Sequence, residues 1–302
     1  MAHRETDVFD RLERFYDAVP RDAAVAEEIG GFVLFVREGE GWPFYARPRL
    51  GADTPSAADV TSVRRRQREL GIPEAFEWVH ENSPDLLAVA RSAGLDVLLA
   101  PLMVLERAAL VPDLPLPGAS IRLLDASSPT FAADLAASRA VGHVGFRTPA
   151  PSSAPLPGDA TAGLIPTGPL SGAPPVAPAG PAERDAVPPP APESLADQQK
   201  GYAAGRFVGG VVETPADGIV ACGTVQRVGD VAEIVGVATL PSARGRGYAS
   251  QLTANLARHA LEQGVNLVFL SAGTDDVARL YSKVGFRRIG TACIAEPAAA
   301  PL

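Results

Sequence analysis

The sequence predicts a mixed α/β protein made of two related halves. Segments rich in Val, Ile and Phe alternate with segments whose apolar residues repeat at helical spacing. Residues 1–117 give the order helix, two strands, helix, strand, helix, strand, which is also the order in the later part of residues 118–302. A chain of 302 residues is long enough for two domains. We therefore expect one α/β domain in each half.

The first half is expected to be an α/β unit of its own. Ser56 suits the N-cap of a helix that Gly71 would end, and Leu114–Pro117 would connect the two halves. A turn at Glu38–Gly41 would let the next strand pair back as a hairpin. The expected helices span residues 8–16, 56–70 and 83–93, and the expected strands span residues 31–37, 42–47, 76–80 and 97–105.

The second half is interrupted by a proline-rich segment at about residues 148–193. This segment has no apolar period, so we expect a disordered or polyproline-like insertion. Both a mobile lid near the acceptor entrance and a functionless insertion stay open. Before it we expect a strand at 121–124 and a helix at 129–141 that Gly142 closes. After it we expect a helix at 194–204, three antiparallel strands at 206–212, 219–228 and 231–240, a helix at 248–263 and a strand at 265–271.

The stretch from Val231 to Gly247 predicts a ligand site. It combines a strand with the corner Arg244-Gly245-Arg246-Gly247 and a helix that follows at once. Alternation along the strand places Val231, Glu233, Val235 and Val237 on one face and Ile234 on the other. Pro241 would end the strand because it has no N–H group to donate.

Such a corner suits an anion, most simply a phosphate or a diphosphate. The first N–H groups of a helix have no intrahelical partners and lie at the positive end of its dipole. Glycine allows close approach of the backbone to a ligand, and two arginines add positive charge. The corner matches neither the Walker loop nor the Rossmann glycine pattern. A surface turn with solvated arginines is the alternative.

Two motifs resemble those of the GNAT family of N-acetyltransferases. Arg244-x-x-Gly247-x-Ala249 is similar to the Arg/Gln-x-x-Gly-x-Gly/Ala signature, and Ala278–Phe286 resembles the second motif, A-x-L-Y-x-x-x-G-F. The resemblance covers about the last third of the chain. It implies a GNAT-like fold, acetyl-CoA as cosubstrate, and a strand that parts from its neighbour beside the thioester arm.

The resemblance also implies which residues hold the cofactor. The corner would bind the diphosphate, and the end of the strand would bind the pantetheine arm. Thr274 stands where the family often has asparagine, which puts that one contact in doubt. The implied cofactor-binding residues are Val237, Ala238, Thr239, Arg244, Gly245, Arg246, Gly247, Tyr248, Ala249 and Thr274.

Two residues are candidates for acid–base chemistry. Glu233 lies among apolar neighbours, where desolvation would raise its pKa, and its placement resembles the glutamate base of the histone-acetyltransferase branch. Pairing of Glu233 with Arg227 is the alternative. Tyr281 lies in the second motif, and the resemblance implies that it protonates the coenzyme thiolate. Packing as a structural aromatic is the alternative for Tyr281.

The first half lacks an Arg-x-x-Gly-x-Gly corner between Trp42 and Ser56. We therefore predict a tandem arrangement in which residues 1–117 form a degenerate GNAT-like copy. Residues 118–302 would form the acetyltransferase domain with its insertion. The basis for the duplication is the order of elements.

Composition narrows the class of protein. The net charge of −8 argues against a nucleic-acid groove. Two cysteines imply neither a disulfide framework nor a metal site. No signal peptide and no uninterrupted run of about 18 apolar residues is recognised, so we expect no membrane span and a cytoplasmic protein. A homodimer is compatible with the sequence, which does not determine the oligomeric state.

The sequence thus favours an acetyl-CoA-dependent N-acetyltransferase acting on a primary amine, on a small molecule or a protein, without a metal. Two alternatives stay open. One is acyl transfer from a longer acyl-CoA or a carrier-protein thioester, and the other is a non-catalytic acyl-CoA sensor or scaffold.

Overall fold

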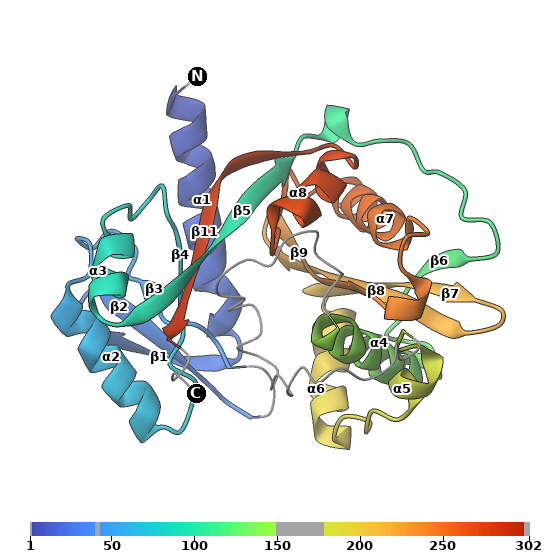
Figure 1. Ribbon diagram of the computed structural model, residues 1–302, viewed down its shortest axis with the longest axis horizontal. Helices are drawn as coiled ribbons and strands as arrows, with labels where there is room; N and C mark the ends of the chain where they lie inside the picture. The colour runs from blue at the N-terminus through green and yellow to red at the C-terminus, as the bar shows by residue number, and fades with distance from the viewer. Residues whose placement is uncertain (1, 40–42, 149–177, 299–302) are drawn as a thin grey trace, which may run out of the picture. The chain divides into compact units, whose positions relative to one another are not determined.

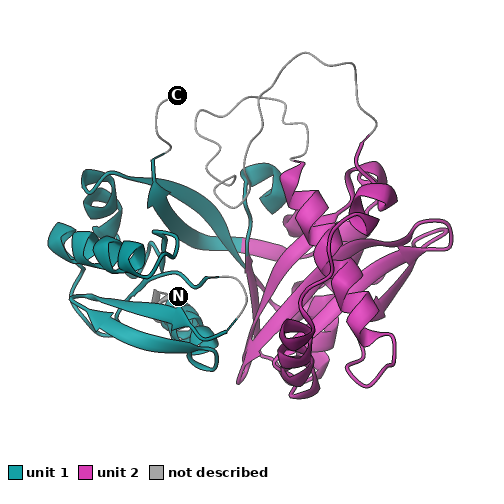
Figure 2. Cartoon of the chain, turned by 90° about the horizontal axis from the view of Figure 1, so that it is seen from below, with its two compact units in different colours: residues 1–103, 271–278, 288–302 teal, residues 104–270, 279–287 magenta. Residues whose placement is uncertain are grey.

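The computed structural model describes residues 2–39, 43–148 and 178–298. The chain forms two compact units, coloured separately in Figure 2. Unit 1 comprises residues 1–103, 271–278 and 288–302, and unit 2 comprises residues 104–270 and 279–287. Each unit is a set of segments that pack against one another. The predicted division at residue 117 is a different one, because it separates two related copies of one fold. That division stays a prediction.

Unit 1 begins with helix α1 (Ala2–Arg21) and a small antiparallel sheet of order β1-β2-β3. Its strands are β1 (Ala24–Ile29), β2 (Phe32–Arg37) and β3 (Arg47–Pro48). The predicted pairing of β2 with residues 42–47 is confirmed only at Arg47, where β3 pairs antiparallel with β2, and β2 pairs along its length with β1, which was not predicted. Strand β1 was not predicted, because its two adjacent glutamates, Glu27 and Glu28, interrupt the alternation of apolar and polar residues. Residues 40–42 of the predicted turn and strand lie outside the described residues.

The rest of unit 1 surrounds an apolar core. Its elements are α2 (Ala57–Glu69), β4 (Phe76–Val79), α3 (Leu86–Ser92), most of β5 (Leu95–Leu105) and most of β11 (Phe286–Pro297), with strand order β4-β11-β5. Phe32, Phe76 and Trp78 pack in this core with residues of α2 and α3. Strand β11 was not predicted. Its register against β4 pairs Cys293 with Trp78. Pairing with β4 therefore holds a strand whose second and third residues are exposed arginines.

Unit 2 is built on a sheet of order β10-β9-β8-β7-β6 (Figure 1). Its strands are β6 (Ser120–Leu123), β7 (Phe207–Thr214), β8 (Gly218–Val228), β9 (Val231–Thr239) and β10 (Leu267–Ser271, with Ser271 assigned to unit 1). Strands β6 to β9 are antiparallel, as predicted for β7 to β9, and β10 is parallel to β9.

Helices cover both faces of the unit 2 sheet. One face carries α7 (Tyr248–Glu262), and the other carries α4 (Phe131–Arg147) with α5 (Pro181–Asp185) and α6 (Pro192–Ala203) nearby (Figure 1). Short 3-10 turns lie at Arg107–Ala109 and Pro241–Ala243. Helix α8 (Asp275–Ser282) contributes residues to both units.

Two predictions for unit 2 need correction. Helix α4 does not end at Gly142 but continues to Arg147. The glycines serve close packing, because a Cβ at Gly145 would lie 3.1 Å from the Cβ of Ala238 on β9. The proline-rich segment is also not structureless to residue 193, since α5 forms within it and α6 starts at Pro192. Residues 149–177 lie outside the described residues.

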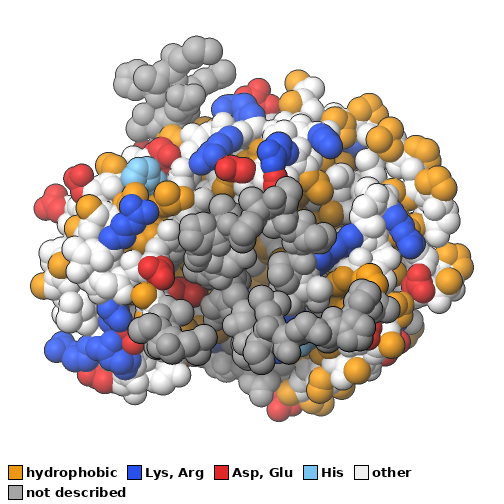
Figure 3. Space-filling view, in the orientation of Figure 1, with side chains coloured by type: hydrophobic (Ala, Val, Ile, Leu, Met, Phe, Trp, Pro, Cys, Tyr) orange, Lys and Arg blue, Asp and Glu red, His pale blue; other side chains and the backbone are white. Residues whose placement is uncertain are grey.

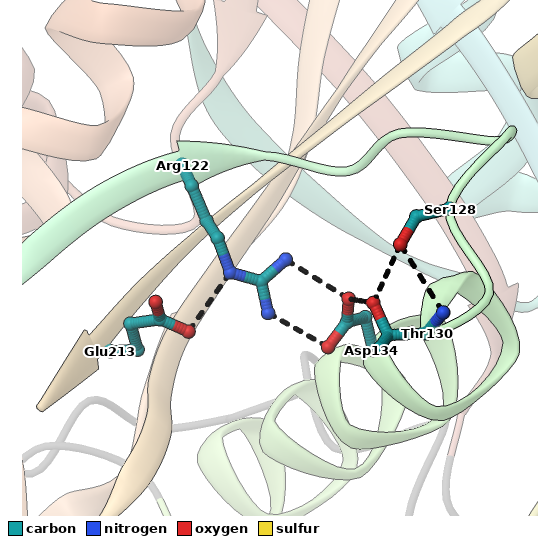
Figure 4. A network of polar contacts seen from close by, with 5 residues as sticks. All are labelled: Arg122, Ser128, Thr130, Asp134 and Glu213. Atoms are coloured by element: carbon teal, nitrogen blue, oxygen red, sulfur yellow. Dashed lines mark hydrogen bonds and ion pairs between the residues drawn. The ribbon is translucent and has the colours of Figure 1, made fainter. Parts of the chain in front are cut away.

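A charged network fixes the start of α4 on the sheet (Figure 4). Arg122 of β6 donates through Nε to Glu213 of β7 at 2.9 Å, and its two terminal nitrogens donate to the Asp134 carboxylate at 2.7 and 3.0 Å. Thr130 donates its hydroxyl to Asp134 at 2.9 Å and exchanges hydrogen bonds with Ser128. A two-pronged arginine–carboxylate contact of this kind holds both partners in a defined geometry.

Surface charge is mixed on the face drawn in Figure 3, where basic and acidic side chains of the described residues are interspersed. Among the described helices, none combines the length and the apolar character that a membrane crossing requires.

Candidate functional site

Strand β9 leaves its parallel neighbour halfway along. The β9–β10 register pairs Val231 with Leu267, Ala232 with Val268, and Glu233 with Phe269, and the recorded ladder goes no further. Strand β9 itself continues to Thr239. Its backbone groups beyond Glu233 therefore have no ladder partners in β10, and an unpaired strand edge can accept an extended ligand.

A β-bulge follows the point where the strands separate. Opposite β8, the pairing Thr224↔Val235 is followed by Cys222↔Ala238, so β9 holds one extra residue there. Gly236 in this segment has φ of +63°, a conformation that glycine adopts without strain. The extra residue reverses the alternation of side chains along β9.

The reversal corrects the predicted face. A Cβ at Gly223 would lie 3.2 Å from Val237 and 3.1 Å from Leu256 of α7, so Val237 points toward α7. Ala238 points toward α4, against Gly145. Counting back through the pairs with β8, Val235 and Glu233 also lie on the α4 face. Simple alternation predicted that Val237 and Glu233 share one face of β9. That prediction is wrong, because the bulge turns Val237 to the other face.

The glycine corner is open. Gly245 and Gly247 both have φ of +79° and are exposed, and a Cβ at either position would meet no described atom within 4 Å. Gly247 is the N-cap of α7 and has no side chain to cap it. The first helical hydrogen bond runs from Gln251 N to Gly247 O at 3.1 Å, so the amides of residues 247–250 precede it. The corner thus presents the free amide end of a 15-residue helix to its surroundings.

The other corner residues differ in exposure. Arg246 is exposed and Arg244 is half-buried, and burial lowers the pKa of the Arg244 guanidinium. Tyr248 is buried beneath the corner, and the Ala249 carbonyl accepts a hydrogen bond from the Thr253 hydroxyl at 2.8 Å. The Thr239 hydroxyl at the end of β9 is buried and has no hydrogen-bond partner among the described residues. An unsatisfied buried hydroxyl is costly unless a ligand completes it.

Glu233 lies at the last paired position before β9 and β10 part, between Gln226 of β8 and Phe269 of β10. Its side chain is partly buried. Arg227 donates to the carbonyls of Gly229 at 2.8 Å and Gln263 at 3.0 Å. The Arg227 guanidinium thus contacts two backbone carbonyls near the end of α7, and both the base role of Glu233 and its pairing with Arg227 stay predictions.

Tyr281 is buried on α8, with its ring centroid 6.1 Å from that of Phe286. Burial raises the pKa of the Tyr281 phenol to about 12, so the hydroxyl is protonated at neutral pH. Thr274, which belongs to unit 1, caps α8 by accepting a hydrogen bond from Val277 N at 3.3 Å. Thr274 thus serves as the N-cap of α8, whereas its contact with a cofactor stays a prediction.

Sequence reasoning missed two glycines that shape this site. Gly236 forms the bulge, and Gly145 lets α4 approach β9. An isolated glycine inside a strand pattern is the signal that predicts a bulge. Gly145 had no comparable signal, because its role depends on a strand almost a hundred residues away.

Comparison with known proteins identifies the domain that carries this site. Residues 180–286 match the acetyltransferase (GNAT) family. No curated protein is similar enough to be detected. Among solved structures, the chain is similar to a GCN5-related N-acetyltransferase from Kribbella flavida, with 19% identity, a TM-score of 0.66 and coverage of 97% of this chain and 96% of that one.

Two further structures are similar in fold. A GCN5-related N-acetyltransferase-like protein from Streptococcus suis is 14% identical with a TM-score of 0.50, covering 96% of this chain and 98% of that one. A tandem GNAT protein from the clavulanic acid biosynthesis pathway is 14% identical with a TM-score of 0.50, covering 90% of this chain and 80% of that one. Residues 180–286 are thus a GNAT-family domain, and nearly the whole chain has the fold of GNAT proteins.

Proposed function

We propose that this protein is an acetyl-CoA-dependent N-acetyltransferase that acts on a primary amine. The observation that carries the proposal is the open glycine corner at the start of α7, directly after the unpaired edge of β9. A helix N-terminus with exposed amides suits a diphosphate, and an unpaired strand edge suits the amide groups of pantetheine. Both lie in the segment that matches an acetyltransferase family.

In this proposal the amides of residues 245–249 hold the diphosphate of acetyl-CoA. The backbone of Val237–Thr239 pairs with the pantetheine arm, and the buried Thr239 hydroxyl gains the partner it otherwise lacks. The thioester then lies along β9, toward the point where β9 and β10 part. Glu233 occupies that point, on the α4 face.

The chemistry follows from these positions. Glu233 accepts a proton from the acceptor ammonium, and the neutral amine attacks the thioester carbonyl carbon. A backbone N–H near Val237 stabilises the oxyanion of the tetrahedral intermediate. The C–S bond then breaks, and Tyr281 donates its proton to the departing thiolate. The nitrogen gives up its remaining extra proton, which restores the Tyr281 phenol, and Glu233 releases its proton to solvent. The products are an N-acetylated amine and coenzyme A. Because its pKa is about 12, Tyr281 carries that proton throughout the neutral range.

The related prediction for the first half also continues as a proposal. We infer that residues 1–117 are a degenerate GNAT-like copy without a cofactor corner. The coverage of nearly the whole chain by GNAT structures supports this proposal, as does the fold similarity to a tandem GNAT protein.

Calorimetric titration with acetyl-CoA, followed by an amine panel with detection of released thiol, tests the proposal. We expect saturable binding and thiol release that requires an amine. Faster turnover with longer acyl-CoA would favour the alternative acyl donor. Binding without thiol release from any amine would favour the sensor, and absence of binding would contradict the proposed function.

A further inference from the structure

The two arginines of the glycine corner make different contacts, and only Arg244 stands at a specified position of the family signature. Arg244 donates through Nη2 to the Gly145 carbonyl at 2.6 Å and through Nε to the Thr239 carbonyl at 3.4 Å. Gly145 is in the last turn of α4, and Thr239 is the last residue of β9. The Arg244 guanidinium therefore ties the corner to the cofactor strand and to the helix on the opposite face.

Arg246 lies two residues further on and is exposed. Its described hydrogen bond, to the carbonyl of Ser242 in the turn just before the corner, is long at 3.4 Å. A long contact of an exposed guanidinium contributes little and breaks readily. The charge of Arg246 is therefore available to an incoming anion, whereas that of Arg244 is half-buried and already hydrogen-bonded to carbonyls.

A backbone contact also fixes the short turn Pro241–Ala243 that leads into the corner. Ser242 N donates to the Ala179 carbonyl at 3.0 Å, and a Cβ at Gly180 would lie 2.8 Å from the Ser242 hydroxyl. Residues 179–180 precede α5, so the corner is held by three separate segments of unit 2. These contacts orient the backbone amides of the corner, whose glycines could otherwise adopt many conformations.

We propose that Arg244 is a positioning residue that holds the corner in its anion-binding shape, while Arg246 supplies the charge that attracts the diphosphate. This inference rests on the proposed function. It predicts that the contribution of Arg246 to acetyl-CoA affinity depends on salt concentration, whereas that of Arg244 does not. Salt screens the attraction between exposed charges, and it has much less effect on the hydrogen bonds of the half-buried Arg244.

The test measures the Kd of the full chain for acetyl-CoA across a range of NaCl concentrations. We expect Arg246→Gln to weaken binding several-fold at low salt and to flatten the dependence of Kd on salt. We expect Arg244→Gln to weaken binding about tenfold while keeping the salt dependence of the wild type. Arg244→Lys should not restore affinity, because an ammonium cannot span both carbonyls.

Arg227 provides a matched control, because it also donates to two backbone carbonyls and lies at the far end of α7. Arg227→Gln should lower Tm about as much as Arg244→Gln does but leave the Kd for acetyl-CoA unchanged. Steady-state kinetics should give the same division. Arg244→Gln should raise the KM for acetyl-CoA with little change in kcat, as expected for lost binding shared by the ground state and the transition state.

Three results would overturn the inference while wild-type binding stands. They are an unchanged Kd in Arg244→Gln, a salt dependence flattened by Arg244→Gln as by Arg246→Gln, and an equal loss of affinity in Arg227→Gln. Failure of the wild type itself to bind acetyl-CoA would overturn the proposed function, and this inference with it.

Discussion

Helix α2 in unit 1 and helix α7 in unit 2 begin in opposite ways. The start of α2 is closed by its own side chains, since the Ser56 hydroxyl accepts from Asp59 N at 3.2 Å and the Asp59 carboxylate accepts from Ser56 N at 2.8 Å. The start of α7 is Gly247, which follows Arg246 and has no side chain to cap the helix. Each helix follows a strand segment, and only α7 leaves its amide end free for a ligand.

Unit 1 thus has an anion built into its helix end. Hydrogen bonding from Ser56 N lowers the pKa of Asp59, and a Cβ at Gly30 would collide with this carboxylate. The same helix end can serve stability or ligand binding, depending on whether the chain supplies the anion. This difference gives a physical reason for the proposal that the first copy has no cofactor site.

The two units also use their carboxylates differently: Glu233 of unit 2 is the proposed base, and Glu77 of unit 1 serves stability. Replacing Glu233 gives the largest predicted effect. We expect Glu233→Gln to lower kcat by about 10²- to 10⁴-fold, as loss of a general base does, without a large change in Tm. Glu77 of β4 is buried in an ion pair with Arg47. Glu77→Gln should cost about 3–5 kcal/mol of stability, because it leaves a buried cation without its charged partner, and should keep kcat. Urea unfolding and steady-state rates on both variants check the contrast.

An anion placed at the start of α7 should weaken the ligand site. We expect Gly247→Asp to weaken acetyl-CoA binding by about 100-fold or more, because the new carboxylate lies beside the free amides and repels the diphosphate. Gly229→Asp is the control, since Gly229 also has positive φ and open space around it. Calorimetry should find the affinity of that control unchanged. Equal affinities in the two variants would break the comparison.

Removing the hydroxyl of Tyr281 should slow the chemical step alone. We expect Tyr281→Phe to lower kcat by about 10- to 100-fold with an unchanged Kd for acetyl-CoA. The phenol is the acid form below its pKa of about 12, so wild-type kcat should not fall with rising pH before about pH 10. A decline in kcat between pH 7 and 9 would argue against Tyr281 as the acid.

The smallest effect is expected at the closed helix end. Asp59→Ala should cost about 1 kcal/mol of unfolding free energy, since it removes a side-chain cap of α2. Acetyl-CoA affinity should stay that of the wild type. A tenfold loss of affinity would instead mean that α2 contributes to the cofactor site.

Patterns among residues that are close in the sequence predicted the elements that carry the site. The elements that were not predicted depend on contacts between residues far apart in the sequence. The strand–corner–helix of Val231–Glu262 and the Ser56 cap depend on glycine, serine and apolar spacing that neighbouring residues reveal. Strands β1 and β11 have polar or charged segments, and their pairing with β2 and β4 defines them. Helix α4 passes Gly142 because Gly145 packs on Ala238, a contact that no local pattern reveals.

The most direct test of the open helix end is an NMR titration of the ¹⁵N-glycine-labelled protein with coenzyme A and, separately, with pantetheine, which lacks the diphosphate. The account predicts that the amide resonances of Gly245 and Gly247 shift with coenzyme A and stay in place with pantetheine. Resonances that stay in place with coenzyme A at saturation, or that shift equally with both ligands, would contradict it.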